Sequence, residues 1–312
     1  MSEPYAYFKK QIMPLADAKI GIMTHAFNYG TGVFEGIRGN WNEEQETIFL
    51  FKIDEHIRRL RDSARIVNIE ISETDDQLRS YILEVVSKSA IREDQYIRPL
   101  AYKSSEVLGV RLHNLEDDLL VFVAPFGPYL DSDAGIRCQT SSWRRVEDVS
   151  IPARAKGTGI YVNSALAKTE ANLNGFDEAI MLNNDGHVSE GSGENIVVIR
   201  DGKLITPAPS DNVLEGITLD TVLGLARDEL GLKTEARTID RSELYIADEV
   251  FMTGTAAHVT PILEVDHRKI GGGNIGPLTA RLKDRYFNII YGRVPEYAHW
   301  LTPVPLRQAI KA

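Results

Sequence analysis

Lys156 and Glu190 are the residues of this chain whose types and setting point most directly to chemistry. Glu190 lies 34 positions after Lys156, in the segment Ser189-Glu190-Gly191-Ser192-Gly193-Glu194-Asn195, which places an acid among glycines. A lysine amine can condense with an aldehyde, and a carboxylate can keep a ring nitrogen protonated. Together they form the minimum equipment for pyridoxal phosphate chemistry, although glycine-flanked acids also occur in ordinary exposed turns.

Three features of the sequence could anchor a phosphate group. Gly216-Ile217-Thr218 stands where a predicted helix begins, and helix N-termini offer free N–H groups, but the segment also fits a plain helix cap. Thr253-Gly254-Thr255-Ala256-Ala257 follows a predicted strand, where loops commonly bind ligands. Arg59 lies on the flank of an amphipathic helix with His56 and Ser63, where it could meet a phosphate or, like most such arginines, be solvated.

Tyr96 and Arg98 occupy alternate positions of a predicted strand, so their side chains should point to the same face. Burying an arginine without a partner costs several kcal/mol, so Arg98 needs an anion or water. Two interpretations remain open: an internal ion pair, or a site for the carboxylate of a substrate.

Several aromatic residues could line a binding site. Tyr29, Phe34 and Gly36 place aromatic rings beside glycines, although each by itself fits a core or turn position. Tyr161 lies five residues after Lys156 and could hydrogen-bond an oxygen of the cofactor, or simply be a buried tyrosine.

Composition limits the class of protein. The 312 residues are 43% apolar and 26% charged, which is ordinary for a globular protein, and the length favours two domains. The net charge of −10 argues against a nucleic-acid partner, and a single cysteine, Cys138, excludes an internal disulfide and a multi-cysteine zinc site. We see no signal peptide, no bilayer-spanning run and no metal-like histidine spacing, and we therefore expect a cytoplasmic protein without a metal or a membrane partner.

The first part of the chain mixes strands and helices. Its predicted elements are strands at 47–53, 95–102 and 118–125, a helix capped by Asp54 with apolar positions from Ile57 to Val67, and a helix at 75–90. Turn residues at 126–135 predict a linker, which gives an N-terminal domain at 1–125 and a C-terminal domain at 136–312.

The second part is predicted to be richer in strands. Its predicted elements are a strand at 136–143, hairpins at 179–190 and 196–206, a helix at 217–230 stopped by Gly231, a strand at 249–253 and a helix from Pro277 to near Gly292. Strict βαβ alternation and internal repeats are absent from the pattern. The sequence predicts a mixed α/β fold with its functional site in the cleft between the two halves.

From about Leu15 to Thr279 the chain resembles the branched-chain amino acid aminotransferases of the fold-type IV pyridoxal phosphate enzymes. The segments that carry this resemblance are 28–38 (NYGTGVFEGIR), 96–100 (YIRPL), 108–110 (LGV), 155–156 (AK) with 161–164 (YVNS), 189–195 (SEGSGEN), 216–218 (GIT) and 251–257 (FMTGTAA). The resemblance implies a small N-terminal α/β domain, a larger C-terminal domain with a mixed-sheet pseudo-barrel, and an active site between them. The implied reaction is transamination of L-leucine, L-isoleucine and L-valine with 2-oxoglutarate, with pyridoxal 5'-phosphate as cofactor.

The resemblance also implies roles for individual residues. Lys156 would form the Schiff base and move the proton, Glu190 would pair with the pyridine nitrogen, and Tyr161 with the phenolic oxygen. The phosphate would be held by Arg59, Ile217, Thr218 and Thr255. Substrate would contact Tyr96, Thr255 and Ala256 through its α-carboxylate and Tyr29, Phe34, Gly36, Arg98 and Tyr129 elsewhere, with Leu108 and Val110 supplied by the neighbouring subunit of at least a homodimer.

Two positions depart from the family's pattern, and three other functions compete. Phe126 stands where many members have tryptophan, and Glu215 stands where proline is common, so that an acid precedes the implied phosphate site. The first rival is an (R)-selective amine or D-amino acid transaminase on the same fold. The second is an aminodeoxychorismate lyase, and the third is a two-domain protein that binds a phosphorylated ligand without chemistry.

Overall fold

The computed structural model describes residues 4–130 and 133–306, which divide into two compact units. Within those ranges, unit 1 contains 4–127, Ala155–Gly159 and 288–306, and unit 2 contains the rest. The predicted domains are contiguous, whereas the short loop that carries Lys156 and the C-terminal segment pack with unit 1. The predicted linker at 126–135 includes the change of unit after Gly127, while its residues 131 and 132 lie outside the described residues.

Unit 1 is built on an antiparallel sheet, with strand order β17-β5-β4-β6-β7-β1-β2 and β3 paired with β6. The strands are β1 (Tyr5–Phe8), β2 (Gln11–Pro14), β3 (Gly32–Phe34), β4 (Ile37–Asn42), β5 (Thr47–Phe51), β6 (Gln95–Lys103), β7 (Asp117–Pro125) and β17 (Leu301–Pro305). The predicted strands at 47–53, 95–102 and 118–125 are confirmed as β5, β6 and β7. The other strands, which are three to six residues long, escaped prediction because their sequences show too little alternation to detect.

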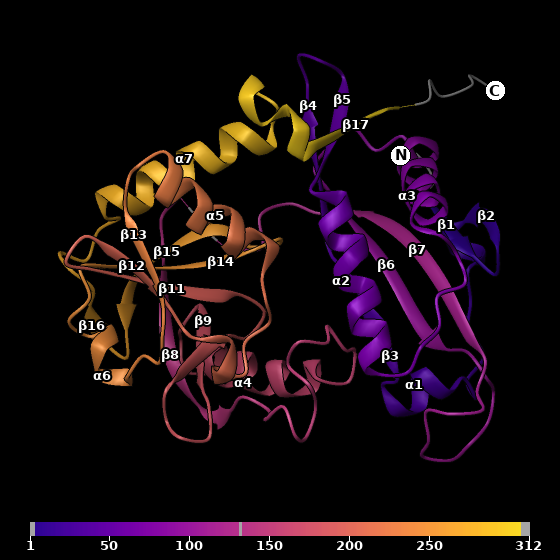
Figure 1. The fold of residues 1–312 in the computed structure, drawn as a ribbon, viewed down its shortest axis with the longest axis horizontal. Coiled ribbons are helices and arrows are strands. Elements are labelled where there is room, and N and C mark those ends of the chain that lie inside the picture. The colour runs from indigo at the N-terminus through magenta and orange to yellow at the C-terminus, as the bar shows by residue number, and fades with distance from the viewer. Residues whose placement is uncertain (1–3, 131–132, 307–312) are drawn as a thin grey trace. The chain divides into compact units, whose positions relative to one another are not determined.

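The helices of unit 1 cover this sheet and enclose its core. They are α1 (His25–Tyr29), α2 (Ile53–Ile66) and α3 (Asp75–Ser89), with short 3-10 helices at Leu15–Asp17 and Pro295–Trp300. Helices α2 and α3 contact each other and the sheet (Figure 1). The buried apolar face of α2 includes Ile57 and Leu60. The predicted cap at Asp54 is wrong: Lys52 is the N-cap, and Asp54 lies in the first turn, where its charge suits the positive end of the helix dipole.

Unit 2 contains a mixed sheet, as predicted, with strand order β10-β9-β8-β15-β14-β11-β12-β13 and β16 paired with β15. The strands are β8 (Ile136–Arg144), β9 (Glu178–Leu182), β10 (Val188–Gly191), β11 (Asn195–Arg200), β12 (Lys203–Thr206), β13 (Lys233–Ala236), β14 (Glu249–Gly254), β15 (His258–Val265) and β16 (Arg268–Lys269). Pairs β8–β9, β8–β15 and β12–β13 are parallel, and the others are antiparallel. Both predicted hairpins are confirmed, as β9–β10 and β11–β12.

The helices of unit 2 are α4 (Tyr161–Leu173), α5 (Ile217–Asp228), α6 (Arg241–Leu244) and α7 (Pro277–Ile290), with a 3-10 helix at Pro209–Asp211. Helices α5 and α7 confirm two predictions, and Gly231 takes the positive φ of 62° expected at a helix stop. Helix α4 was not predicted, because the residues it buries are Ser164, Ala167 and Ala171, whose small side chains leave a weak apolar period. It packs on β8 and β9 (Figure 1).

Candidate active site

Lys156 lies in a loop that the backbone of unit 1 holds in place. Its amide N donates to Ser63 Oγ of α2 at 3.1 Å, and its carbonyl O accepts from the amide of Phe34 at 3.0 Å. The amine Nζ lies 5.2 Å from the centroid of the Phe34 ring, which is within range of a cation–π contact. The loop therefore presents the amine beside an aromatic wall rather than to open solvent.

The side chains of Tyr96 and Arg98 lie together beside the Phe34 ring. Arg98 Cζ lies 4.3 Å from the centroid of Phe34, and its Nη2 donates to Tyr96 Oη at 3.1 Å. A Cβ at Gly36 would lie 2.1 Å from Tyr96 Oη, so only glycine fits there. The prediction that Tyr96 and Arg98 share a face is confirmed.

The ion-pair interpretation of Arg98 is wrong. Among the described residues no acid pairs with its guanidinium, and its buried Nε has no hydrogen-bond partner. Buried donors are seldom left without an acceptor, so this N–H is a candidate contact for an anion. The Phe126 ring is tilted by 51° against that of Tyr96, with the two ring centroids 5.3 Å apart.

Tyr29, Leu108 and Val110 form a separate, more exposed group in unit 1. The Tyr29 hydroxyl accepts from the amide of Gly109 at 3.1 Å, and His25 Nε2 lies 2.9 Å from Gly109 O. These bonds tie the 108–110 segment to α1. Leu108 is 63% exposed and Val110 is 91% exposed, so their side chains do not enter a site within this chain.

Arg59 is not solvated as most such arginines are. Its side chain is 14% exposed and forms a two-point ion pair with Glu35, from Nε to Oε1 at 2.7 Å and from Nη2 to Oε2 at 2.9 Å. His56 Nδ1 lies 2.6 Å from Glu35 Oε2. Burial alone would raise the pKa of Glu35, but Arg59 and His56 outweigh it and hold that pKa well below its usual range. Sequence analysis missed Glu35, because a single acid before Gly36 carries no pattern.

In unit 2, Glu190 is a buried and fully engaged carboxylate rather than an exposed turn acid. Oε1 accepts from Arg145 Nη2 at 2.7 Å, and Oε2 accepts from Asn195 Nδ2 at 3.1 Å and from the amide of Leu214 at 3.0 Å. The guanidinium stabilises the charged form of the carboxylate. Arg145 was also missed, since nothing in its sequence spacing links it to Glu190.

The predicted phosphate segment begins α5. Gly216 is the N-cap, and within the described residues no side chain caps the first turn. A Cβ at Gly216 would lie 1.9 Å from Asn195 Oδ1, so this asparagine both requires the glycine and holds Glu190. Thr218 is buried in the first turn. Glu215, the acid that precedes this segment, is 63% exposed and pairs with Arg154 at 3.5 Å.

Thr255 and Ala256 lie half-buried in the turn between β14 and β15, at the same end of the sheet as the glycine-rich acid segment. This follows from the register, because Asn195 of β11 pairs with Thr253 of β14. Thr253 Oγ1 is buried and has no hydrogen-bond partner among the described residues. The sheet therefore brings the 189–195 and 253–257 segments together.

A cluster of ionisable groups surrounds Tyr129 in unit 2. Lys168 Nζ lies 2.5 Å from Glu178 Oε2 and 5.3 Å from the centroid of Tyr129. Burial and the charge of Glu178 raise the pKa of Glu194 to about 8. Burial, followed by the charge of Glu194, raises the pKa of Tyr129. The charge of Tyr161, the first residue of α4, also raises the pKa of Tyr129. Two predicted site residues therefore lie in this cluster.

Glu194→Gln should remove a pH-dependent loss of stability. Between about pH 4.5 and 8 the folded protein keeps a proton on Glu194 that the unfolded chain releases, so unfolding becomes easier as pH rises through this window. Over this window the free energy of unfolding should fall by roughly 2–4 kcal/mol less in the variant than in the unmodified protein. Urea unfolding of the cofactor-free protein at about pH 5.5 and about pH 8.5 measures it, and parallel losses in both proteins would contradict the assignment.

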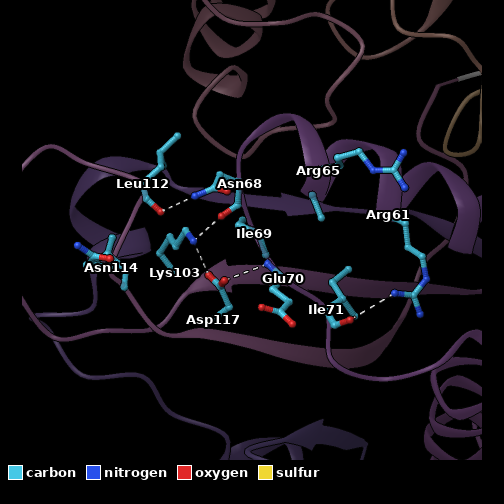
Figure 2. A pocket seen from close by; sticks show the side chains of 12 residues that line it. Arg61, Arg65, Asn68, Ile69, Glu70, Ile71, Lys103, Leu112, Asn114 and Asp117 are labelled. Atoms are coloured by element: carbon cyan, nitrogen blue, oxygen red, sulfur yellow. Dashed lines mark hydrogen bonds and ion pairs between the residues drawn. The ribbon is translucent and has the colours of Figure 1, made fainter.

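A polar pocket in unit 1 contains none of the predicted site residues. Figure 2 shows Lys103 between Asn68 and Asp117 in this pocket. Lys103 Nζ lies 2.8 Å from Asp117 Oδ1 and donates to Asn68 O at 2.5 Å. Arg61 also contacts Asp75 and the carbonyl of Glu73. The pocket's cations are thus largely engaged by the chain itself.

Two kinds of feature are absent from the described ranges. No group of three or more His, Cys, Asp or Glu side chains is placed to hold a metal ion. No helix there combines the length and apolar character needed to cross a bilayer.

Comparison with known proteins gives consistent results. The family described as "Amino-transferase class IV" matches residues 32–265. A protein of Aquifex aeolicus (strain VF5) named "Probable branched-chain-amino-acid aminotransferase" is 51% identical over 303 residues, with 97% of each chain covered.

Solved structures agree in fold. A branched-chain aminotransferase of Thermoproteus uzoniensis, solved with norvaline, is 41% identical with a TM-score of 0.92 and covers 97% of this chain and 99% of its own. A branched-chain amino acid aminotransferase of Thermobaculum terrenum, solved in its PLP form, is 37% identical with a TM-score of 0.92 over the same shares.

Proposed function

The chain belongs to the branched-chain aminotransferases of the class IV aminotransferase family, and from this premise we propose its reaction and the residues that perform it. The reaction is transfer of the amino group of L-leucine, L-isoleucine or L-valine to 2-oxoglutarate, which gives branched-chain 2-oxo acids and L-glutamate. The observation that carries this proposal is the Phe34–Tyr96–Arg98 cluster, in which apolar ring faces and buried N–H donors lie together.

The donor set fits pyridoxal 5'-phosphate, the cofactor that the family uses. Lys156 offers an amine for covalent attachment, and Glu190 offers a charged, buried carboxylate for the ring nitrogen. The uncapped first turn of α5, with Ile217 and Thr218, offers N–H and hydroxyl donors for a phosphate. We further assign Arg59 and Thr255 to the phosphate and Tyr161 to the phenolic oxygen.

When bound, the cofactor supplies an electron sink that makes the Cα–H bond of the amino acid acidic. We propose that Lys156 carries the proton between Cα of the amino acid and the C4′ carbon of the cofactor. Tyr96, Thr255 and Ala256 hold the α-carboxylate and so fix the Cα–H bond toward that amine. The Phe34 ring beside the amine limits access of water to it.

One pocket must serve two chemically different side chains. We propose that Phe34, Gly36 and the rings of Tyr29 and Tyr129 bury a branched side chain, which contributes roughly 1.5–3 kcal/mol. The distal carboxylate of glutamate would use Arg98 and the tyrosine hydroxyls instead, with charge-assisted bonds of about 1.5–3 kcal/mol each. Apolar donor and anionic acceptor then share the same space in turn.

Arg98→Ala should therefore harm glutamate far more than leucine. Loss of one charge-assisted bond predicts a fall of about tenfold to a hundredfold in kcat/KM for glutamate. Leucine should change by less than about threefold, because its side chain needs no cation. Separate half-reactions with each amino acid measure this difference. Equal losses for both substrates would make Arg98 a structural residue.

We propose that the active protein is at least a homodimer. Leu108 and Val110 are exposed apolar side chains on a segment that Tyr29 and His25 hold rigid, and exposure of this kind suits contact with a second copy. They would then enter the neighbouring subunit's site. A monomer mass by light scattering in active preparations would contradict this.

We also propose a cytoplasmic location, which cell fractionation would test.

The function itself is tested with purified protein and two substrate pairs. Leucine with 2-oxoglutarate should turn over much faster than D-alanine with the same acceptor. Comparable or reversed rates would favour an (R)-amine or D-amino acid transaminase. Pyruvate release without an amino acceptor would indicate a lyase, and a colourless protein without bound cofactor would indicate a binding protein.

A further inference from the structure

Glu35 is a buried acid for which the proposed reaction has no role. It follows β3 directly, between Phe34 and Gly36, and is 0% exposed. Its backbone N donates to Pro99 O of β6 at 2.8 Å, so the base of its side chain is fixed to the sheet. A buried carboxylate is costly unless it is paired, and this one is paired on both oxygens.

The partners of Glu35 lie on successive turns of α2. Arg59 contacts both carboxylate oxygens, through Nε at 2.7 Å and Nη2 at 2.9 Å. His56 approaches Oε2 at 2.6 Å, and burial, with the charges of Arg59 and Lys156, lowers the pKa of His56 despite Glu35. The neutral ring then donates Nδ1–H to the carboxylate. The next turn supplies Ser63, which binds the backbone of Lys156.

A two-point bond of this kind fixes the plane of a guanidinium as well as its position. Arginine has a long side chain, and immobilising such a side chain on binding costs free energy. Because Glu35 holds Arg59 before any ligand arrives, that cost has been met in folding. A guanidinium held in this way is preorganised for an anion.

We propose that Glu35, supported by His56, is a positioning residue that aims the Arg59 guanidinium at the cofactor phosphate. The inference rests on the proposed function, because it concerns the phosphate of that function's cofactor. It differs from a role as a simple counter-charge in the sign of its effect. A carboxylate that only neutralises Arg59 would weaken phosphate binding, so its removal would strengthen it.

The test compares two cofactor forms that differ only in the phosphate. Full-length protein stripped of cofactor is titrated with pyridoxal 5'-phosphate and, separately, with pyridoxal, and the two dissociation constants are read from cofactor absorbance. Glu35→Gln keeps the size of the side chain but places an amide donor against Arg59 or His56, which breaks the two-point bond. We expect Glu35→Gln to bind pyridoxal 5'-phosphate about tenfold more weakly, with little or no change in its affinity for pyridoxal.

Matched variants separate orientation from folding. Asp117→Asn breaks another buried ion pair of unit 1, with Lys103 in the pocket of Figure 2, and should change neither affinity. Glu35→Asp keeps the charge but draws it back from Arg59, so it should show the same phosphate-selective loss. This variant serves as the test if Glu35→Gln fails to fold. Arg59→Gln should also weaken the binding of pyridoxal 5'-phosphate but not of pyridoxal. Adding Glu35→Gln to Arg59→Gln should cause little further loss of affinity.

Four results would overturn the proposal, and they are distinguishable. Equal losses for both cofactor forms in Glu35→Gln would mean a structural role, and tighter binding of the phosphorylated form would mean a counter-charge role. A non-selective Arg59→Gln would remove Arg59 from the phosphate site and the inference with it. Failure of the unmodified protein to bind either form would instead sink the proposed function.

Discussion

Lys156→Ala should abolish transamination, with a fall in kcat of at least about 10³-fold. The size follows from the loss of two roles at once, because the same amine attaches the cofactor and moves the proton. The cofactor should still bind, though more weakly, since the proposed contacts of Glu190 and of α5 do not depend on the lysine. Single-turnover absorbance after mixing with leucine measures the chemical step apart from binding.

The matched control is Lys203→Ala, which removes an exposed lysine of β12 and should leave turnover unchanged. A second readout does not depend on activity: borohydride reduction followed by peptide mass spectrometry should place the cofactor on Lys156 in the unmodified protein. Finding the cofactor on another residue, or turnover within tenfold of normal in Lys156→Ala, would refute the central assignment.

The sequence could predict most of the larger elements, and it offered candidate site residues in both units. Strands β6, β7, β11 and β14 and helices α2, α3, α5 and α7 carry apolar periods long enough to recognise, together with stops such as Gly231. The predicted residues lie in several places: around Phe34 and Lys156 and on the 108–110 segment in unit 1, and around Glu190 and around Tyr129 in unit 2. Some of these residues lie where a regular element begins or ends, as Phe34 does at the end of β3 and Tyr161 at the start of α4, whereas Arg59 and Arg98 lie within α2 and β6.

The partners of the buried charges could not be predicted. Glu35 meets Arg59 across 24 residues and Arg145 meets Glu190 across 45, and neither pair has a local period or spacing. Such pairs are selected by the packed fold, because an unpaired buried charge is too costly to leave. The loop of Lys156 joins unit 1 rather than its sequence neighbours through its backbone: the amide of Phe34 donates to the Lys156 carbonyl, and Ser63 Oγ accepts from the Lys156 amide.

Glu190→Gln should lower kcat by about 10²-fold or more while the cofactor still binds. The carboxylate has both oxygens fixed by Arg145, Asn195 and the amide of Leu214, so its charge is oriented before the cofactor arrives. An amide of the same shape keeps the packing but cannot stabilise a proton on the ring nitrogen. Half-reaction rates with leucine, and the ¹⁵N chemical shift of labelled cofactor, report the two consequences separately.

The interpretation requires that loss of charge, not loss of folding, explains this fall, because Arg145 stays buried without its anion. Glu243→Gln is the matched control: it breaks the ion pair with Arg237 in the same unit and should leave kcat unchanged. Arg145→Met leaves the carboxylate in place, so it should destabilise the fold yet slow turnover less than Glu190→Gln does. Near-normal turnover in Glu190→Gln would mean that the acid serves folding, with Arg145 as its partner, and not the reaction.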